Sequence, residues 1–313
     1  MSVPAVSTEE FVALINRIKN VSAVAKHLQI TEGPVRKRML RLERKGYRFE
    51  ISDKRSYRNV PDTNPGRINM QIDNGVVMIA SDAHYFPDNI TRAHLAFVKM
   101  CRELNPRVVV MNGDVFDGAT ISRWPRIGWD NKPTVKQELD TCIARLQEIT
   151  DAAPRAAYVW PLGNHDARFE TFLAANASEY EGVKGFHLKD NFPEWKPCWS
   201  LFINENTVIK HRFKGGIHAT HNNTLWAGRS IVTGHLHSLK STPLSDYDPW
   251  TRYGVDSGTL ADPCGEQFKD YTEDNPVNWR SGFVVLTYHD GFLLPPEICE
   301  VTPLGAVFRG KVI

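Results

Sequence analysis

Five short polar stretches constrain the fold of this 313-residue chain more than any other feature. Each one follows a run of apolar or β-branched residues of the kind that forms a buried strand. They supply carboxylate, amide and imidazole groups, which are ligands of metal ions. The pattern therefore predicts that several strand ends meet around one pair of metal ions. The stretches are D-A-H at 82–84, G-D-V-F-D at 113–117, G-N-H-D at 163–166, the single His211, and G-H-L-H at 234–237.

The residues around these stretches predict a mixed α/β fold. Apolar runs at 76–80, 107–111 and 156–160 read as strands, and helical patterns lie between them, one capped by Asn89 and one over 134–151. This alternation favours a parallel or mixed sheet with helices outside. The second half of the chain instead shows short strands. We therefore expect an α/β fold of two sheets packed face to face and flanked by helices. The short strands are predicted at 201–203, 207–209, 231–233, 283–286 and 292–294.

The order and wording of the five stretches resemble those of the calcineurin-like metallophosphoesterases, over about residues 75–240. That family shows D-x-H, G-D-x-x-D, G-N-H-D/E, a single H, and G-H-x-H. The resemblance implies metal-dependent hydrolysis of a phosphoester and two divalent ions, for which Mn, Zn, Fe or Ni suits carboxylate and imidazole ligands. It implies a first ion held by Asp82, His84, Asp114 and His237, and a second held by Asp114, Asn164, His211 and His235.

The same resemblance gives His165 a catalytic role, in which it contacts the phosphate and protonates the leaving oxygen. Either Asp117 or Asp166 would orient its ring. For the single histidine, His211 is favoured because an apolar run leads directly into it, and His221 and then His218 are the alternatives. His94 lies opposite the apolar positions of its predicted helix and is expected to be exposed.

Residues 1–50 predict a winged helix-turn-helix domain that binds DNA. Thr8 is the expected cap of a first helix, a second covers 22–28, a third starts near Pro34, and 47–51 alternates like a strand. Residues 1–60 carry thirteen Lys and Arg against six Asp and Glu, a net +7 in a chain of net +2. A polyanion is the expected partner, and the alternative is a helical module that docks a protein. The expected DNA contacts are Arg36, Lys37, Arg38, Arg41, Arg44 and Lys45.

The domain boundaries follow from these patterns. Residues 51–70 hold few apolar positions and read as a linker, and 71–313 form the phosphoesterase domain. Five scattered cysteines without a C-x-x-C pair argue against cysteine ligation of metal and favour a reduced, cytoplasmic setting. No apolar run approaches the roughly 20 residues that cross a membrane, so no membrane partner is expected.

One departure from the family pattern bears on the substrate. Phosphoprotein phosphatases of the family usually show D-x-H-G and G-D-x-x-D-R-G, whereas Tyr85 follows His84 and Gly118 follows Asp117 here. Their phosphate-binding Arg is missing from its place, and Arg123 or Arg126 could replace it. Long loops also hold aromatic side chains that could stack on bases or simply pack. We expect a phosphodiesterase or nuclease that acts on nucleic acid. The alternatives are a DNA-binding regulator with a non-catalytic body, and a phosphomonoesterase or nucleotidase.

Overall fold

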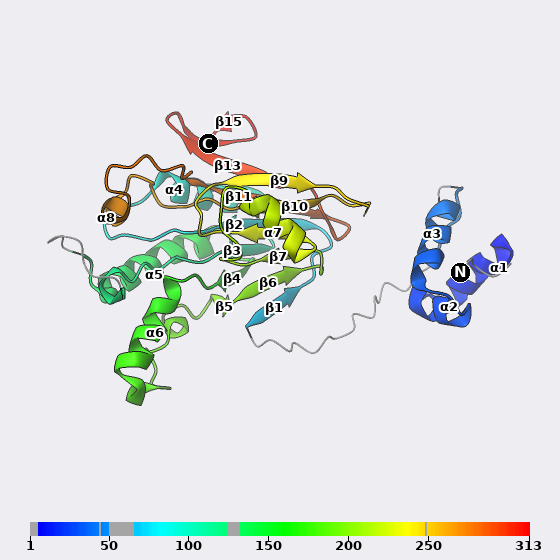
Figure 1. Cartoon of the computed structure of the whole chain (residues 1–313), viewed down its shortest axis with the longest axis horizontal. Coiled ribbons are helices and arrows are strands. Elements are labelled where there is room, and N and C mark those ends of the chain that lie inside the picture. Colours follow the sequence, from blue (N-terminus) through cyan, green and yellow to red (C-terminus); the bar gives the residue numbers. More distant parts are fainter. Residues whose placement is uncertain (1–5, 44, 50–65, 124–131, 248) are drawn as a thin grey trace. The chain divides into compact units, whose positions relative to one another are not determined.

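The computed structural model describes residues 6–43, 45–49, 66–123, 132–247 and 249–313. The chain divides into two compact units, Met1–Pro65 and Gly66–Ile313 (Figure 1). The linker was expected to run to residue 70, but it ends earlier, because Arg67–Met70 form strand β1 and pair in parallel with Ser200–Ile203. Backbone pairing to a central sheet overrides the polar composition that suggested a linker.

The smaller unit is a bundle of three helices, α1 (Thr8–Ile18), α2 (Val21–His27) and α3 (Glu32–Glu43). Its core joins one apolar face of each helix, and it includes Phe11, Val24 and Val35. The cap of α1 is Ser7 rather than Thr8, because Ser7 and Glu10 form a reciprocal capping box. Residues 47–49 have no regular structure, so the described part of the predicted wing is not a strand; residues 50 and 51 lie outside the described residues.

The larger unit contains two sheets. The six-stranded sheet has the order β1-β6-β7-β8-β10-β9, and the nine-stranded sheet has the order β15-β14-β13-β11-β2-β3-β4-β5 with β12 paired to β11. The strands of the first are β1 (Arg67–Met70), β6 (Ser200–Ile203), β7 (Thr207–Ile209), β8 (Ser230–Thr233), β9 (Lys240–Leu244) and β10 (Arg252–Asp256). Those of the second are β2 (Gly75–Ala80), β3 (Val108–Met111), β4 (Ala157–Pro161), β5 (Lys196–Cys198), β11 (Gly282–His289), β12 (Phe292–Leu293), β13 (Glu297–Thr302), β14 (Gly305–Phe308) and β15 (Lys311–Val312).

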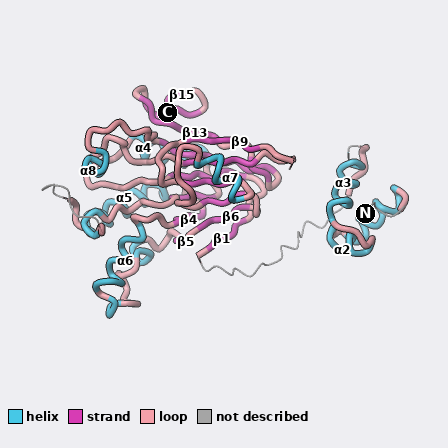
Figure 2. Tube along the Cα trace, viewed as in Figure 1, coloured by secondary structure: helices cyan, strands magenta, loops and turns pink. Residues whose placement is uncertain are grey.

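Helices cover the outer faces of the sheets, while the strands lie together in the middle (Figure 2). Alternation along β2 shows the layering: Val77 and Ile79 face the core between the sheets, whereas Met78 and Ala80 face the helices. The helices are α4 (Arg92–Leu104) and α5 (Val135–Ala152) on the side of the nine-stranded sheet, and α7 (Ala219–Ala227) against the six-stranded one. Shorter helices are η1 (Ala119–Ile121), η2 (Ser178–Tyr180), η3 (Leu188–Asn191), η4 (Glu266–Phe268) and α8 (Lys269–Thr272). Helix α6 (Asp166–Asn176) contacts the short helices η1, η2 and η3.

This architecture confirms the predicted fold class of two sheets flanked by helices. The strands predicted before the first three polar stretches are present within one residue of their expected bounds. The predicted Asn89 cap is wrong, because the Thr91 hydroxyl accepts the His94 amide at 3.2 Å and starts α4. Among the described residues, no helix has both the length and the apolar character needed to cross a bilayer.

Candidate metal centre

The five polar stretches lie beyond the carboxyl ends of β2, β3, β4, β7 and β8. In the nine-stranded sheet β2, β3 and β4 are parallel neighbours, and in the six-stranded sheet β7 and β8 are parallel neighbours. Parallel neighbours end at the same edge of a sheet, so each sheet presents its polar stretches together. The packing of the two sheets then brings both sets of ends to one site.

Unusual backbone conformations turn the ligand residues into this site. Five of the seven predicted metal ligands, all of them described, have φ in the left-handed region: 52° at Asp82, 39° at His84, 51° at Asp114, 71° at His235 and 55° at His237. Each such non-glycine residue costs on the order of 1 kcal/mol and persists where the surroundings fix it. A tight turn held by the carbonyls of Gly113 and Asp114 brings Asp82 and His84 together.

The first group of candidate ligands consists of Asp82, His84 and His237, all of them buried. Their ligand atoms lie within 4.8 Å of one another. Nε2 of His237 is 2.9 Å from Oδ1 of Asp82, and Nε2 of His84 is 4.0 Å from the same oxygen. This group matches three of the four residues predicted for the first ion.

The second group consists of Asp114, His211 and His235, again within 4.8 Å. Nε2 of His211 is 3.1 Å from Oδ2 of Asp114 and 3.9 Å from Oδ1 of Asp82, so the two groups adjoin. His218 and His221, the alternatives to His211, are exposed at the start of α7 and belong to neither group.

Two buried polar atoms indicate that this site suits a cation. Oδ1 of Asn164 has no hydrogen-bond partner among the described residues, and Nε2 of His211 faces the carboxylates of Asp114 and Asp82. An unpaired polar atom in a protein interior costs about 1–3 kcal/mol, so such atoms usually serve a ligand. An amide oxygen and an imidazole nitrogen beside two carboxylates form the donor set that a divalent transition metal takes.

Neighbouring acceptors orient two of the histidines. Nδ1 of His84 is 2.9 Å from Oδ1 of Asp117, and Nδ1 of His211 is 2.7 Å from the Asn112 carbonyl. Each Nδ1–H donates to its oxygen, so Nε2 is the ring atom that faces the site, where a metal ion could bind in place of a proton. Asp117, which forms a further group with His84 and His165 within 4.8 Å, lies outside the two groups described above and orients one of their histidines.

Asp117 also holds the predicted general acid. Its Oδ1 accepts from Nδ1 of His165 at 2.6 Å, while Nε2 of His165 points toward Asp114, 3.9 Å from Oδ2. Burial would lower the pKa of His165, but the hydrogen bond to Asp117 raises it above its ordinary value. The imidazolium form, which can donate a proton, is thus favoured.

Asp166, the other candidate for orienting His165, has a different role in the structure. Its carboxylate accepts five N–H groups at 2.8–3.1 Å. It therefore ties the end of β3 to the end of β4, and among the described hydrogen bonds none joins its side chain to His165. The donors are the backbone amides of Asp114, Val115, Phe116 and Gly163 and the indole of Trp160.

Arg168 is the functional candidate that the sequence analysis missed. Its Nη2 lies 3.2 Å from Nε2 of His165, and its Nη1 donates to the Asp117 carbonyl at 2.9 Å. The signal was its position three residues after His165, since a helix that starts there places the two side by side. Of the arginines proposed from the sequence, Arg126 lies outside the described residues and Arg123 borders that gap.

The electrostatics of the site favour added positive charge. Burial would raise the pKa of Asp114, but attraction to His211 holds it well below its usual range. Burial would lower the pKa of His211, yet Asp82 and Asp114 raise it to about 10. Both shifts show that these carboxylates attract a cation strongly, and bound divalent ions would meet that demand.

His94 was expected to be exposed, and this expectation is wrong. The side chain is fully buried, because both ring nitrogens find partners: the Tyr85 hydroxyl at 2.9 Å and the Glu148 carboxylate at 2.7 Å. Satisfied hydrogen bonds allow a polar ring inside a core.

Aromatic side chains of the loop after α6 pack on one another or on aromatic residues of β4. Tyr180 stacks on Phe186, with centroids 4.9 Å apart, and Phe192 meets Trp160 at 5.0 Å. Trp124 and Trp129 lie outside the described residues. Two aromatics that the sequence did not single out instead flank the first group, Phe268 at 5.1 Å from His84 and Trp279 at 4.5 Å from His237.

The basic residues of α3 differ in their surroundings. Lys37, Arg41 and Lys45 are exposed, and Arg36 is exposed but paired with Glu32 at 3.0 Å. Arg38 was expected to contact DNA, but its guanidinium donates to the Val6 carbonyl at 2.6 Å and lies over the Phe11 ring. It therefore joins α3 to the start of α1. Arg44 lies outside the described residues.

Comparisons with known proteins gave one family match and two structural likenesses. The sequence model of a family described as calcineurin-like phosphoesterase matches residues 75–273. Among solved structures, Yfce, a phosphoesterase from E. coli, is 15% identical with a TM-score of 0.32, over 71% of this chain and 97% of that one. A protein serine/threonine phosphatase from Saccharomyces cerevisiae, with similarity to human phosphatase PP5, is 10% identical with a TM-score of 0.34, over 72% of this chain and 76% of that one. No curated protein sequence matches the chain significantly.

Proposed function

The chain belongs to the calcineurin-like phosphoesterase family and is a metal-dependent phosphoester hydrolase, and we propose that it is a phosphodiesterase or nuclease that acts on nucleic acid. The proposed ligands of its two ions are those of the family pattern. One set is Asp82, His84, Asp114 and His237, and the other is Asp114, Asn164, His211 and His235. We also propose a cytoplasmic location, on the basis of the cysteine pattern.

The observation that carries the proposal is the pair of adjoining ligand groups, with the buried and unpaired amide oxygen of Asn164 as a further possible ligand. Bound there, two divalent ions would lower the pKa of a shared water and offset the charge of the phosphoryl oxygens.

The chain's own residues supply proton transfer and orientation. His165, held by Asp117, would donate its Nε2 proton to the leaving oxygen, a contribution typically worth about 10²–10⁴-fold in rate. The Arg168 guanidinium beside Nε2 would donate to a phosphoryl oxygen and thereby keep the leaving oxygen within reach of His165.

Two features support a diester of nucleic acid over a phosphoprotein. The phosphate-binding Arg of the phosphoprotein phosphatases is absent after Asp117, and Arg168 approaches from α6 instead. The N-terminal unit presents exposed Lys37, Arg41 and Lys45, which suit a polyanion.

The test is hydrolysis of bis(p-nitrophenyl) phosphate and of DNA with Mn²⁺, Zn²⁺, Fe²⁺ or Ni²⁺. Asp114→Asn should abolish turnover and lose bound metal, because it removes a ligand. His165→Ala should lower kcat by about 10²–10⁴-fold while metal content, measured by elemental analysis, stays at the wild-type level. Lys99→Ala, at an exposed position on α4, is the control. Absence of turnover with all four ions would refute the proposal.

A DNA-binding regulator with a non-catalytic body is the second candidate, favoured by the exposed cations of α3. The full chain with Lys37→Ala, Arg41→Ala and Lys45→Ala separates the two. A regulator would lose DNA binding and show no turnover before or after the change. A nuclease would keep its turnover of the small substrate and lose efficiency on long DNA. A phosphomonoesterase or nucleotidase would prefer p-nitrophenyl phosphate and show no effect on DNA.

A further inference from the structure

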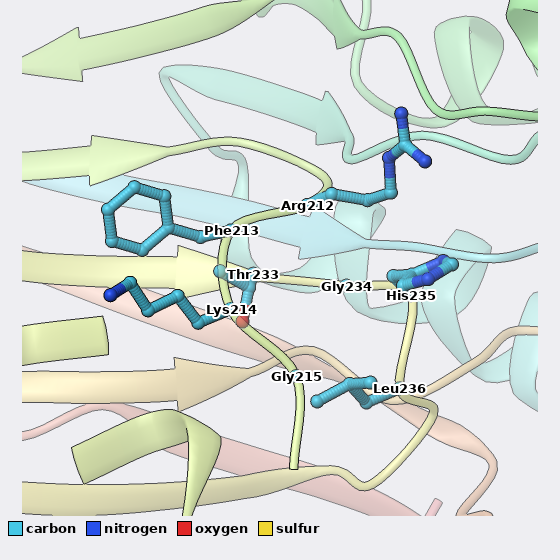
Figure 3. A pocket seen from close by; sticks show the side chains of 8 residues that line it. All are labelled: Arg212, Phe213, Lys214, Gly215, Thr233, Gly234, His235 and Leu236. Atoms are coloured by element: carbon cyan, nitrogen blue, oxygen red, sulfur yellow. The ribbon is translucent and has the colours of Figure 1, made fainter. Parts of the chain in front are cut away.

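A cavity of about 460 Å³ opens beside the second group of candidate ligands. One wall is the segment that follows His211, here called the 212–217 loop, and the other is the end of β8 with His235 and Leu236 (Figure 3). The cavity thus shares His235 with the candidate metal centre. The loop continues into α7, which packs on β8, β9 and β10.

Cations without counter-charges line and border this cavity. Arg212 and Lys214 line it, and Lys210 lies just before His211. Within the described ranges, no carboxylate lies within 4.0 Å of any of the three, although salt bridges occur elsewhere on the surface. An anion is the complementary ligand.

Aromatic rings alternate with these cations. Nζ of Lys214 lies 3.2 Å from the centroid of Trp226, and Nζ of Lys210 lies 5.3 Å from that of Phe213. Trp226 and Phe213 are nevertheless 69% and 43% exposed, so much of each ring faces solvent. Cations that meet phosphates and rings that stack on unpaired bases are the two components of sites for single-stranded nucleic acid.

The loop is held in place before any ligand arrives. The buried Asn223 of α7 pairs with the backbone of Lys214 in both directions: its Oδ1 accepts the Lys214 amide at 3.1 Å, and its Nδ2 donates to the carbonyl at 3.2 Å. Lys240 donates to the Ile217 carbonyl at 2.8 Å. A loop fixed in this way binds with a smaller loss of conformational entropy.

We propose that the 212–217 loop and α7 form a binding track that leads a single strand of nucleic acid to the metal centre. Figure 3 shows Arg212 and His235 on one side of the loop, and Phe213 and Lys214 on the other. Arg212 would hold a phosphate next to the one being cleaved, and Lys214, Phe213 and Trp226 would hold the following nucleotides. Duplex DNA fits less well, because its bases are already stacked and cannot meet the rings. This inference rests on the proposed function and specifies its substrate.

The test compares two substrates in the full chain with Mn²⁺. For wild type, Lys214→Gln and Trp226→Ala, kcat/KM is measured on a twelve-nucleotide oligothymidine, an arbitrary probe length, and on bis(p-nitrophenyl) phosphate. The ratio of the two values should fall about tenfold in each variant, because one phosphate contact or one stacked base is lost. The matched control is Lys99→Gln, on α4 across the other sheet, which should leave the ratio unchanged. Thermal melting checks that each variant folds.

A binding measurement separates failure of the track from failure of the proposed function. Fluorescence anisotropy of the labelled oligothymidine should show about tenfold weaker binding in Lys214→Gln and Trp226→Ala, whether or not the strand is cleaved. A duplex of equal length should compete less well than the single strand. An unchanged ratio with unchanged binding, or equal competition by the duplex, would overturn the track even if hydrolysis is confirmed. If the wild type hydrolyses neither substrate but Lys214→Gln and Trp226→Ala still bind the oligothymidine more weakly than it does, the proposed function is refuted and the track is retained.

Discussion

Asp117 shows how much one carboxylate outside both candidate ligand groups can control. It accepts from Nδ1 of His84 at 2.9 Å and from Nδ1 of His165 at 2.6 Å. It thereby fixes the orientation of a candidate ligand and of the candidate acid at once. The sequence named Asp117 only as one of two ways to orient His165, because spacing along the chain cannot show a second partner.

For Asp117→Asn we expect both the metal affinity and kcat to fall, each by about 10–100-fold, because an amide cannot accept from two ring N–H groups equally well. His165→Ala should affect kcat alone. Metal titration and steady-state kinetics measure the two effects. Asp140→Asn, on the exposed face of α5, is the control. A loss of kcat with unaltered metal affinity would show that the contact to His84 has no consequence.

Glu138 is a buried carboxyl group that the sequence did not mark. It accepts the amides of Gly118 at 2.6 Å and Ala119 at 3.1 Å, and so fixes the chain just after Asp117. Burial, together with the charge of Asp117, raises the pKa of Glu138 to about 7 from its ordinary value of 4.5.

The folded chain should therefore bind the proton of the Glu138 carboxyl group more tightly than the unfolded chain. The stability that the proton confers is complete below pH 4.5 and is lost as the pH rises to about 7, by about 3 kcal/mol. Glu138→Gln should remove this loss. Urea unfolding of both proteins between pH 5 and 8 measures it, with the exposed Glu103→Gln as control. Parallel pH profiles of wild type and Glu138→Gln would contradict the expectation.

The elements that the sequence predicted best are those whose strands are buried on both faces. Continuous apolar runs before the polar stretches identified β2, β3 and β4, since strands between helices and a second sheet need apolar residues on both sides. β9 was missed because it is an edge strand with Pro243, which only an edge tolerates. The left-handed backbone at five candidate ligands could not be predicted from the sequence either, because hydrogen bonds to residues distant in the chain impose it.

The junction of β3, β4 and α6 depends on Asp166, whose carboxylate collects five N–H donors from these elements. We expect Asp166→Asn to lower the free energy of unfolding by about 3 kcal/mol, because the amide NH₂ would face donors and leave some unpaired. Urea unfolding measures the change. Asp190→Asn, which alters an exposed carboxylate that accepts the Gly185 amide, should cost less than 1 kcal/mol. Equal effects of the two would contradict this role.

At the scale of the whole molecule, the two units have separate apolar cores, one within the three helices and the others around the two sheets. The stretch at 51–70, with its few apolar positions, predicted a division of the chain, and the larger unit begins at Gly66 rather than after residue 70. Separate cores allow the units to unfold independently, and the candidate metal centre belongs to the larger unit alone.

Calorimetry should therefore show two transitions. Removal of metal by a chelator should lower the unfolding midpoint of the larger unit by about 10 °C, since the buried carboxylates lose their counter-charge. The midpoint of the smaller unit should not change. Addition of Mn²⁺ should restore the midpoint of the larger unit. A single transition, or a shift of both, would show that the units unfold together.

The candidate ligands come from the ends of strands in both sheets, so neither sheet alone can assemble the site. A refolding chain would gain its affinity for Mn²⁺ only when the two layers have closed on each other with every turn in its final geometry. Binding of Mn²⁺ during refolding would then report the last stage of folding. A loosely collapsed chain whose strands have already formed would still fail to bind the ion.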